Sequence, residues 1–257
     1  MVLLDVCNLT KTFGGLTAIN DLNISVVKGE ILGLIGPNGA GKTTALNMIS
    51  GSISPTKGKC TFKNEDITGL PPHRISKKGI SRVFQGNVLF YNLTVMNNVL
   101  LGMHMRDNLG FWSSVINGAH SRNLDRKMYE KACDILELFG LADKTDEIAI
   151  NLSHGNQRLL CMSIALASDP DLLLLDEPVS GMNDQEVTAM LSLIRKLQKN
   201  SGITIILVEH NMRAVMNLCD RIVVISYGAK IAEGSPGEIT NNPVVIEAYL
   251  GTEDNVV

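Results

Sequence analysis

The chain carries near its N-terminus the stretch Ile31-Leu32-Gly33-Leu34-Ile35-Gly36-Pro37-Asn38-Gly39-Ala40-Gly41-Lys42-Thr43-Thr44. An apolar run of strand length breaks here into a glycine-rich turn that ends in Lys-Thr, before residues 44–49, which can start a helix. The glycines can take positive φ and bring backbone N–H groups close to an anion, while Lys42 supplies a charge and Thr43 a hydroxyl for Mg²⁺. The strand–loop–helix order fits the pattern G-x-x-x-x-G-K-[ST]. We predict a phosphate site made of Gly36, Pro37, Asn38, Gly39, Ala40, Gly41, Lys42, Thr43 and Thr44.

The composition indicates a soluble globular protein with a substantial core. The 257 residues are 45% hydrophobic, and the formal net charge of −3 argues against binding to bare nucleic acid. The cysteines stand singly, without a CxxC pair or metal-ligand spacing, as is typical of small buried thiols in a reducing compartment. The N-terminus lacks a signal-peptide pattern, and no apolar run has the length of a membrane span. We expect a chain that does not cross a membrane.

The remaining pattern predicts an α/β fold with a helical insertion. Residues 22–26 alternate apolar and polar side chains, which suggests antiparallel strands laid beside the phosphate-binding strand. From residue 87 to about 149 we expect helices: one over 95–101 capped by Thr94, an irregular segment over 104–123 around Phe111 and Trp112, and a helix over 124–139. Other expected elements are strands at 59–62, 81–84, 172–175, 203–208 and 221–226, and a helix at 186–199.

Two acidic residues directly follow a continuous apolar run. Residues 172–175 have the composition of a parallel strand covered on both faces, and Asp176 and Glu177 come next. Phosphoryl-transfer sites commonly place a metal ligand and a water-orienting group at the carboxyl end of a strand beside the phosphate loop. We predict that Asp176 holds Mg²⁺ and that Glu177 polarises the attacking water. Taken alone, such a pair is more often a solvated strand end; the phosphate loop upstream reverses that preference.

Shortly before this pair stands the segment Leu152-Ser153-His154-Gly155-Asn156-Gln157. With this segment, the order of motifs resembles that of the ATP-binding-cassette (ABC) ATPases. The resemblance runs from about residue 3 to 251. It implies an α/β P-loop NTPase (RecA-like) core with an N-terminal antiparallel β subdomain and an inserted α-helical subdomain. The implied organisation is a single ABC ATP-binding domain over 1–257, with core residues 1–86 and 159–240, a helical subdomain with the signature motif over 87–158, and a C-terminal tail over 241–257.

The resemblance also implies roles for individual residues, with ATP and Mg²⁺ as cofactors. Lys42 and Thr43 match the phosphate lysine and the magnesium hydroxyl of the Walker A motif, and Asp176 and Glu177 match the Walker B motif. The other implied positions are the glutamine loop at Gln85, which is catalytic and metal-binding, the switch histidine at His210, and the adenine-stacking ring at Phe13. From the residues alone, Phe13 is either an aromatic ring exposed in a polar turn or an ordinary core residue, and the core alternative is favoured.

The signature motif implies a dimer. A helix that starts there would aim the N–H groups and hydroxyl of Ser153 and Gly155 at the γ-phosphate of a nucleotide on a second subunit. Binding would close the dimer and hydrolysis would open it, so a lone chain should hydrolyse ATP poorly. Three residues depart from the common family pattern: His154 replaces a glycine, Asn156 a glutamine and Asn183 an aspartate. The change at 183 keeps a hydrogen-bonding side chain but removes its charge.

Softer similarities indicate one branch of the family. Residues 11–18, 208–212 and 245–251 are similar to ATPases that drive importers of branched-chain amino acids and their relatives for urea and short amides. This branch implies a motor subunit at the cytoplasmic side of the cell membrane, paired with itself or a related ATPase. Its partners would be a membrane permease and, indirectly, a substrate-binding protein. Apolar residues 88–93 could line a groove for a permease helix or belong to the local core.

A soluble, non-transport ABC ATPase, acting in DNA repair, chromosome handling or translation, is the alternative class. Such proteins usually carry two cassettes or long coiled coils, whereas this chain has one cassette and no sustained heptads. A regulatory nucleotide-binding module without turnover is disfavoured by Glu177. No pattern in the sequence identifies the transported substrate.

Overall fold

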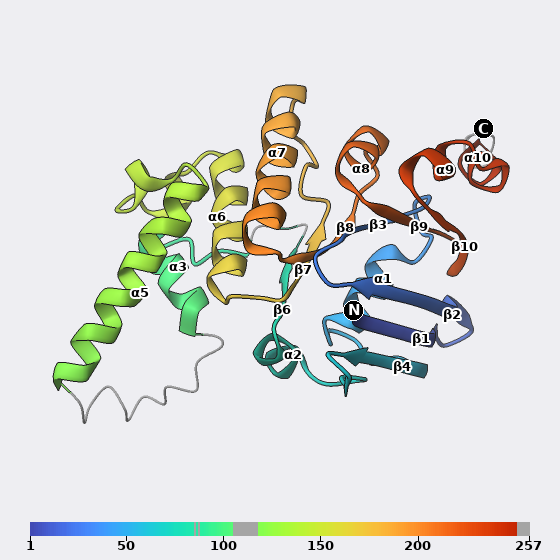
Figure 1. Ribbon diagram of the computed structural model, residues 1–257, viewed down its shortest axis with the longest axis horizontal. Helices are drawn as coiled ribbons and strands as arrows, with labels where there is room; N and C mark the ends of the chain where they lie inside the picture. Colours follow the sequence, from blue (N-terminus) through green and yellow to red (C-terminus); the bar gives the residue numbers. More distant parts are fainter. Residues whose placement is uncertain (85, 87, 105–117, 251–257) are drawn as a thin grey trace. The chain divides into compact units, whose positions relative to one another are not determined.

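The glycine-rich stretch folds into the predicted strand, loop and helix. In the computed structural model, β3 (Ile31–Ile35) leads into the loop and α1 (Lys42–Ile49) begins at the lysine (Figure 1). The structure describes residues 1–84, 86, 88–104 and 118–250. The chain forms two compact units, one of Met1–Ile75 with Leu174–Val257 and one of Ser76–Leu173. The subdomain boundaries expected from the sequence stay a prediction.

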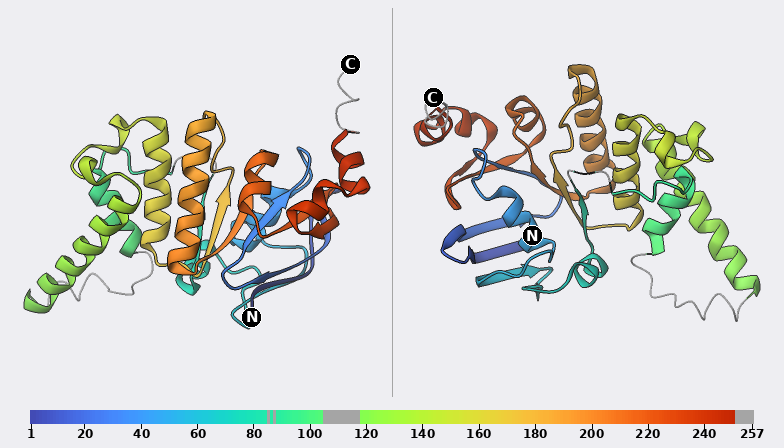
Figure 2. Two further views of the ribbon diagram at one scale, coloured as in Figure 1. Left: turned by 45° about the horizontal axis from the view of Figure 1, so that its top comes forward. Right: turned by 180° about the vertical axis from the view of Figure 1, so that it is seen from behind.

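The N-terminal strands of the first unit form a separate antiparallel sheet. Leu22, Ile24 and Val26 are buried and their neighbours less so, because successive strand residues point to opposite faces. The predicted antiparallel pairing is confirmed. Their expected place beside the phosphate-binding strand is wrong, because β3 pairs with other strands on both of its sides. The sheet order is β2-β1-β4-β5, with bounds β1 Val2–Phe13, β2 Leu16–Val27, β4 Lys57–Phe62 and β5 Glu65–Asp66. Figure 1 labels its first three strands, and Figure 2 shows them from two further sides.

A mostly parallel sheet forms around β3. It pairs in parallel with β8 (Thr204–Val208) on one side and with β9 (Arg221–Ser226) on the other. Every residue of β3, β7 (Leu172–Asp176) and β8 is buried, which explains their continuous apolar runs. The sheet order is β10-β9-β3-β8-β7-β6, with β10 (Ala229–Gly234) antiparallel to β9. Strand β6 (Ile80–Val83) and the first two residues of β7 belong to the second unit.

Capping residues set the ends of the helices in the first unit. Helix α7 (Asp184–Ser201) begins two residues before the predicted start, because Asn183 and Glu186 form a capping box, and it ends at Gly202 with φ 65°. Helix α8 (Met212–Leu218) is capped by the side chain of Asn211. Helices α9 (Pro236–Thr240) and α10 (Pro243–Leu250) follow β10.

The second unit is mainly helical. Helices α3 (Val95–His104), α5 (Gly118–Leu138) and α6 (His154–Ala167) contact one another. Thr94 caps α3 as predicted, since its hydroxyl accepts a hydrogen bond from the Asn97 N–H at 3.2 Å. The expected irregular segment over 104–123 is wrong for residues 118–123, which are helical; Phe111 and Trp112 lie outside the described residues. The shorter elements are α2 (Pro72–Lys78), which crosses the boundary between the units, and the 3₁₀ turns Ala142–Lys144 and Ala149–Asn151.

Among the described residues, no helix has both the length and the apolar character needed to cross a membrane.

Candidate active site

At two positions, the loop after β3 has a backbone conformation that only glycine can adopt. Gly36 and Gly41 have φ of 154° and 103°. A Cβ atom on Gly36 would lie 2.0 Å from the Ile225 carbonyl oxygen, and one on Gly41 would lie 2.6 Å from the Ala18 carbonyl oxygen. The neighbouring strands therefore fix the loop so closely that no side chain fits at either glycine.

The turn between β9 and β10 supports the same loop. The Gly228 N–H donates to the Ala40 carbonyl at 3.0 Å, and the Gly228 carbonyl accepts from the Asn20 N–H at 2.8 Å. From α10, burial raises the pKa of the Tyr249 hydroxyl to about 12, while the backbone of Gly36 lowers it in part. The phosphate loop thus rests on elements from both ends of the chain.

Lys42 bends back into the loop that precedes it. Its ammonium group is buried and donates to the carbonyls of Gly36 at 2.7 Å and Pro37 at 2.9 Å. Burial lowers the pKa of Lys42, and the charges of Glu177 and Asp176 oppose that shift. The carboxylate pair therefore acts electrostatically on the lysine of the loop.

The carboxyl ends of β3, β7 and β8 bring the predicted catalytic side chains together. Asp176 ends β7 and is buried, and the Glu177 N–H donates to the Val208 carbonyl at 2.9 Å. His210 follows β8, and its Nδ1 lies 3.6 Å from Oε1 of Glu177. Glu177 has a φ of 51°, a left-handed conformation that is unusual for a residue with a side chain. Sequence reasoning did not single out Glu209, which lies between Val208 and His210 and is fully buried.

Of two further predicted site residues, the structure describes Phe13 but not Gln85. Phe13 ends β1 with 48% of its surface exposed, and the Lys11 ammonium lies 5.0 Å from its ring centre. An exposed ring at this position could stack on a base, and that role stays a prediction. Gln85 lies outside the described residues.

The signature residues begin α6 in the second unit. Ser153 is the N-cap, and its hydroxyl accepts a hydrogen bond from the Asn156 N–H at 3.3 Å. Ser153 and His154 are exposed, whereas Gln157 is buried and donates to the Leu152 carbonyl at 3.2 Å. The helix N-terminus therefore presents exposed residues, and the backbone N–H groups of a first helical turn suit an anion.

The residues present fit a magnesium ion that also binds phosphate. Thr43 is exposed at the start of α1, and Asp176 offers a carboxylate; both supply the oxygen ligands that Mg²⁺ prefers. No group of three or more His, Cys, Asp or Glu residues that could hold a metal occurs within the described part of the chain. That donor set suits Mg²⁺, which usually takes one or two protein ligands and completes its shell with phosphate and water.

The fold and this site define a P-loop ATPase of the ATP-binding-cassette type. The "ABC transporter" family model matches residues 19–180, and the "Branched-chain amino acid ATP-binding cassette transporter" model matches residues 229–255. The chain is 40% identical to the high-affinity branched-chain amino acid transport ATP-binding protein BraF of Pseudomonas aeruginosa, over 97% of this chain and 98% of that protein.

Solved structures agree with this similarity. The ADP conformation of MJ1267, an ATP-binding cassette of an ABC transporter, is 31% identical with a TM-score of 0.84, over 98% of this chain and 99% of that one. A dimeric structure of MJ0796, a bacterial ABC transporter cassette, is 25% identical with a TM-score of 0.77, over 91% of this chain and 99% of that one. The chain belongs to the ABC transporter family, among the ATP-binding proteins of branched-chain amino acid transport, and is the ATPase motor subunit of an importer.

Proposed function

We propose that this chain binds MgATP at the β3 loop, hydrolyses it with Glu177 and His210, and so drives a permease that imports branched-chain amino acids. The observation that carries the proposal is the meeting of Lys42, Asp176, Glu177 and His210 at one edge of the parallel sheet. The name of the relative BraF supports the choice of cargo. Importers of urea or short amides are the alternative, because the same site would serve them.

Each side chain has a task that follows from its chemistry. Lys42 and the loop N–H groups bind the β- and γ-phosphates. Thr43 and Asp176, with Gln85 as a predicted further ligand, would hold Mg²⁺, which neutralises charge on the phosphates when bound. Glu177 accepts a hydrogen bond from the attacking water and orients it, and the His210 imidazole, whose Nδ1 lies 3.6 Å from Oε1 of Glu177, would assist at the same site.

The working form is a dimer of ATPase subunits. Ser153 and Gly155 at the exposed N-terminus of α6 suit the γ-phosphate of ATP bound to the partner subunit, because N–H groups and the helix dipole favour an anion. The dimeric relative MJ0796 supports this arrangement. The partner is a second copy of this chain or a related ATPase.

The second unit offers a surface for the permease. Its apolar docking surface is exposed, with Phe90 at 59%, and it also includes Val88, Tyr91, Ile148 and Ile150. The Ile150 N–H donates to the Tyr91 carbonyl at 3.1 Å, which joins the two segments. Fully buried Asn98 fixes the Phe90 backbone by accepting from its N–H at 2.9 Å and donating to its carbonyl at 3.1 Å.

These apolar side chains are exposed on a backbone that hydrogen bonds hold in place. We therefore favour a role of residues 88–93 in docking a permease helix over a role in the local core. A permease bound there would keep the chain at the cytoplasmic side of the membrane as a peripheral subunit.

Replacing Glu177 tests the proposed chemistry. In Glu177→Gln the amide keeps the shape of the side chain but polarises water poorly, so ATP should bind and the dimer should stay closed. We expect turnover to fall by about 100-fold or more and an ATP-dependent dimer to appear in size-exclusion chromatography. Glu137→Gln on the exposed side of α5 is the control and should hydrolyse ATP normally. Near-normal hydrolysis by Glu177→Gln would remove Glu177 from its role.

A further inference from the structure

Glu209 is a buried acidic residue to which the proposed ATP hydrolysis assigns no role. It follows β8 directly, precedes His210 and has no exposed surface. Burial raises the pKa of its carboxyl group, and hydrogen bonds from the backbone of Val179 and Asn211 partly oppose the shift. A buried carboxylate is costly unless hydrogen-bonded. The partners of Glu209 are therefore informative, and they are backbone groups of two different segments.

The two carboxylate oxygens of Glu209 link the ends of two neighbouring strands. Oε1 accepts from the Val179 N–H at 3.0 Å, and Oε2 accepts from the Asn211 N–H at 3.5 Å. Val179 lies two residues after Glu177, beyond the end of β7, and Asn211 directly follows His210 at the cap of α8. The carboxylate thus connects the segment that carries Glu177 with the segment that carries His210.

Glu177 requires such support because of its backbone. A left-handed φ in a residue with a side chain costs on the order of 1–3 kcal/mol and persists only when the surroundings fix it. Its own N–H is fixed by the Val208 carbonyl at 2.9 Å, and the Ser180 N–H donates to the Glu177 carbonyl at 3.2 Å. The hydrogen bond from Val179 to Glu209 fixes the middle of this turn.

We propose that Glu209 is a positioning residue for ATP hydrolysis, which holds the Glu177 carboxylate and the His210 imidazole at a fixed separation. The proposal rests on the proposed role of Glu177 in orienting water. A carboxylate suits this position better than an amide, since it accepts at both oxygens and presents no donor to either backbone N–H. Misplacing a reactive group by about 1 Å can lower a rate on the order of 100-fold.

Two substitutions in the full chain test the proposal through steady-state MgATP hydrolysis and melting temperature. Glu209→Met fills the same space but accepts no hydrogen bond, and Glu209→Gln keeps one acceptor oxygen. We expect kcat to fall about 30- to 100-fold in the Met variant and about 3- to 10-fold in the Gln variant. The KM for ATP should stay within about twofold in both, because the phosphate loop is unchanged.

Thr204→Val is the matched control on the same strand. Thr204 begins β8, at the end away from His210, and is fully buried; its hydroxyl accepts from the Gly29 N–H at 2.9 Å. This variant also loses a buried hydrogen bond from a backbone N–H to a side chain. We expect a lower melting temperature with unchanged kcat.

The outcomes separate this proposal from the proposed function. A kcat within about twofold of the unaltered chain in Glu209→Met, or an equal loss in Thr204→Val, overturns the positioning role. If Glu209→Met fails to fold, the test uses Glu209→Gln, and a kcat within about twofold of the unaltered chain then overturns the positioning role. Glu177→Gln is measured alongside. Normal hydrolysis there rejects the role of Glu177, whereas an inactive Glu177→Gln beside a fully active Glu209→Met rejects the role of Glu209 alone.

Discussion

Gly36 begins the phosphate loop at a point where the β9 backbone leaves no room for a side chain. A methyl group there would lie 2.0 Å from the Ile225 carbonyl oxygen, and a backbone oxygen cannot move aside cheaply. The position also has a φ of 154°. Both a steric and a conformational reason thus require glycine at residue 36.

We predict that Gly36→Ala destabilises the fold by about 3 kcal/mol or more and lowers ATP affinity at least about tenfold, because the loop must shift. Denaturant unfolding and titration with a fluorescent ATP analogue measure both effects. Gly14→Ala is the control: Gly14 has a φ of 56°, but an added Cβ meets no atom within 4 Å. It should cost only about 1–2 kcal/mol, and an equal cost at both sites would contradict the steric explanation.

The sequence predicts candidate residues whose spacing is local, but it does not single out Glu209, whose proposed role depends on a distant contact. Lys42 and Thr43 follow from the loop pattern, and Asp176 and Glu177 from the apolar run before them. Glu209 occupies the same kind of position after β8, yet its partner Val179 lies 30 residues earlier in the chain. No periodicity indicates which of the polar residues after a strand turns inward.

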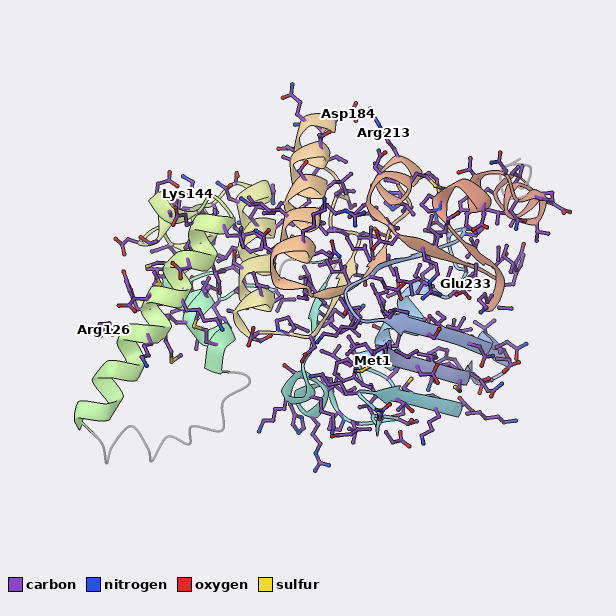
Figure 3. The ribbon with its side chains drawn as sticks, in the orientation of Figure 1. Met1, Arg126, Lys144, Asp184, Arg213 and Glu233 are labelled. Carbon is purple, nitrogen blue, oxygen red and sulfur yellow. The ribbon has the colours of Figure 1, made fainter. Side chains whose placement is uncertain are left out.

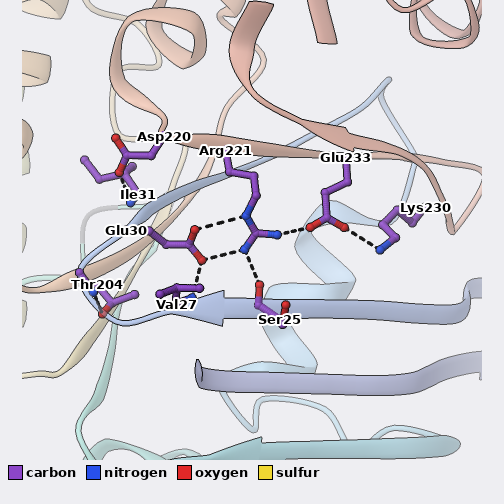
Figure 4. A network of polar contacts seen from close by, with 10 residues as sticks. Ser25, Val27, Glu30, Ile31, Thr204, Asp220, Arg221, Lys230 and Glu233 are labelled. Carbon is purple, nitrogen blue, oxygen red and sulfur yellow. Dashed lines mark hydrogen bonds and ion pairs between the residues drawn. The ribbon is translucent and has the colours of Figure 1, made fainter. Parts of the chain in front are cut away.

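One arginine of β9 contacts both the neighbouring strand of its own sheet and the antiparallel sheet. Arg221 donates to Oε1 of Glu30 at 2.8 Å and also to the Ser25 carbonyl and to Glu233, which itself pairs with Lys230 (Figure 4). Ser25 lies on β2 and Glu233 on β10, so this network ties the antiparallel sheet to the parallel one. Its side chains are largely shielded from solvent, which makes their loss costly.

Removing the guanidinium should therefore lower stability in a pH-dependent way. Burial alone would raise the pKa of Glu233, but Lys230 and Arg221 lower it below its ordinary value of 4.5. A lowered pKa stabilises the fold above pH 4.5, and this stabilisation is lost as the pH falls through the folded-state pKa. We predict that Arg221→Met loses about 1–3 kcal/mol at neutral pH and that the difference from the unaltered chain shrinks towards about pH 3.

Urea unfolding across that pH range measures the effect. Arg213→Met is the control, since its pair with Asp184 spans 4.0 Å and both side chains are exposed (Figure 3). Its stability should match that of the unaltered chain. A pH-independent loss in Arg221→Met would show that the network acts through packing instead of charge.

The elements themselves were largely predictable, whereas the neighbours of β3 were not. Continuous apolar runs predict β7 and β8, and the helical period of apolar residues predicts α7, each to within a few residues, because burial on two faces or on one leaves a local pattern. Strand β2 also alternates as expected, but alternation does not specify which strand lies alongside. Pairing between residues far apart in the chain depends on the packing of the whole unit, which a local pattern does not contain.

For the whole assembly, the proposed docking role of the apolar surface predicts that a charge placed there uncouples ATP turnover from transport. We predict that Phe90→Asp leaves ATP binding intact and reduces substrate-dependent transport in reconstituted vesicles at least about tenfold, because a charge cannot be buried against a permease helix. Tyr129→Asp places the same charge at a half-exposed aromatic residue on α5 and should transport normally. Unchanged transport by the Phe90 variant would exclude this surface as the permease contact.

The order of strands around β3 also has a consequence for synthesis on the ribosome. Strand β3 is made before both strands that pair with it, which come from residues 204–226, about 170 to 190 residues later. At roughly 5–20 residues per second, the delay is on the order of ten to forty seconds. Until then the nascent glycine loop lacks the Ile225 carbonyl and the Gly228 amide against which it packs. The nucleotide site can therefore take its final form only after β8, β9 and the turn at Gly228 have been made, and we expect ATP to bind from that point on.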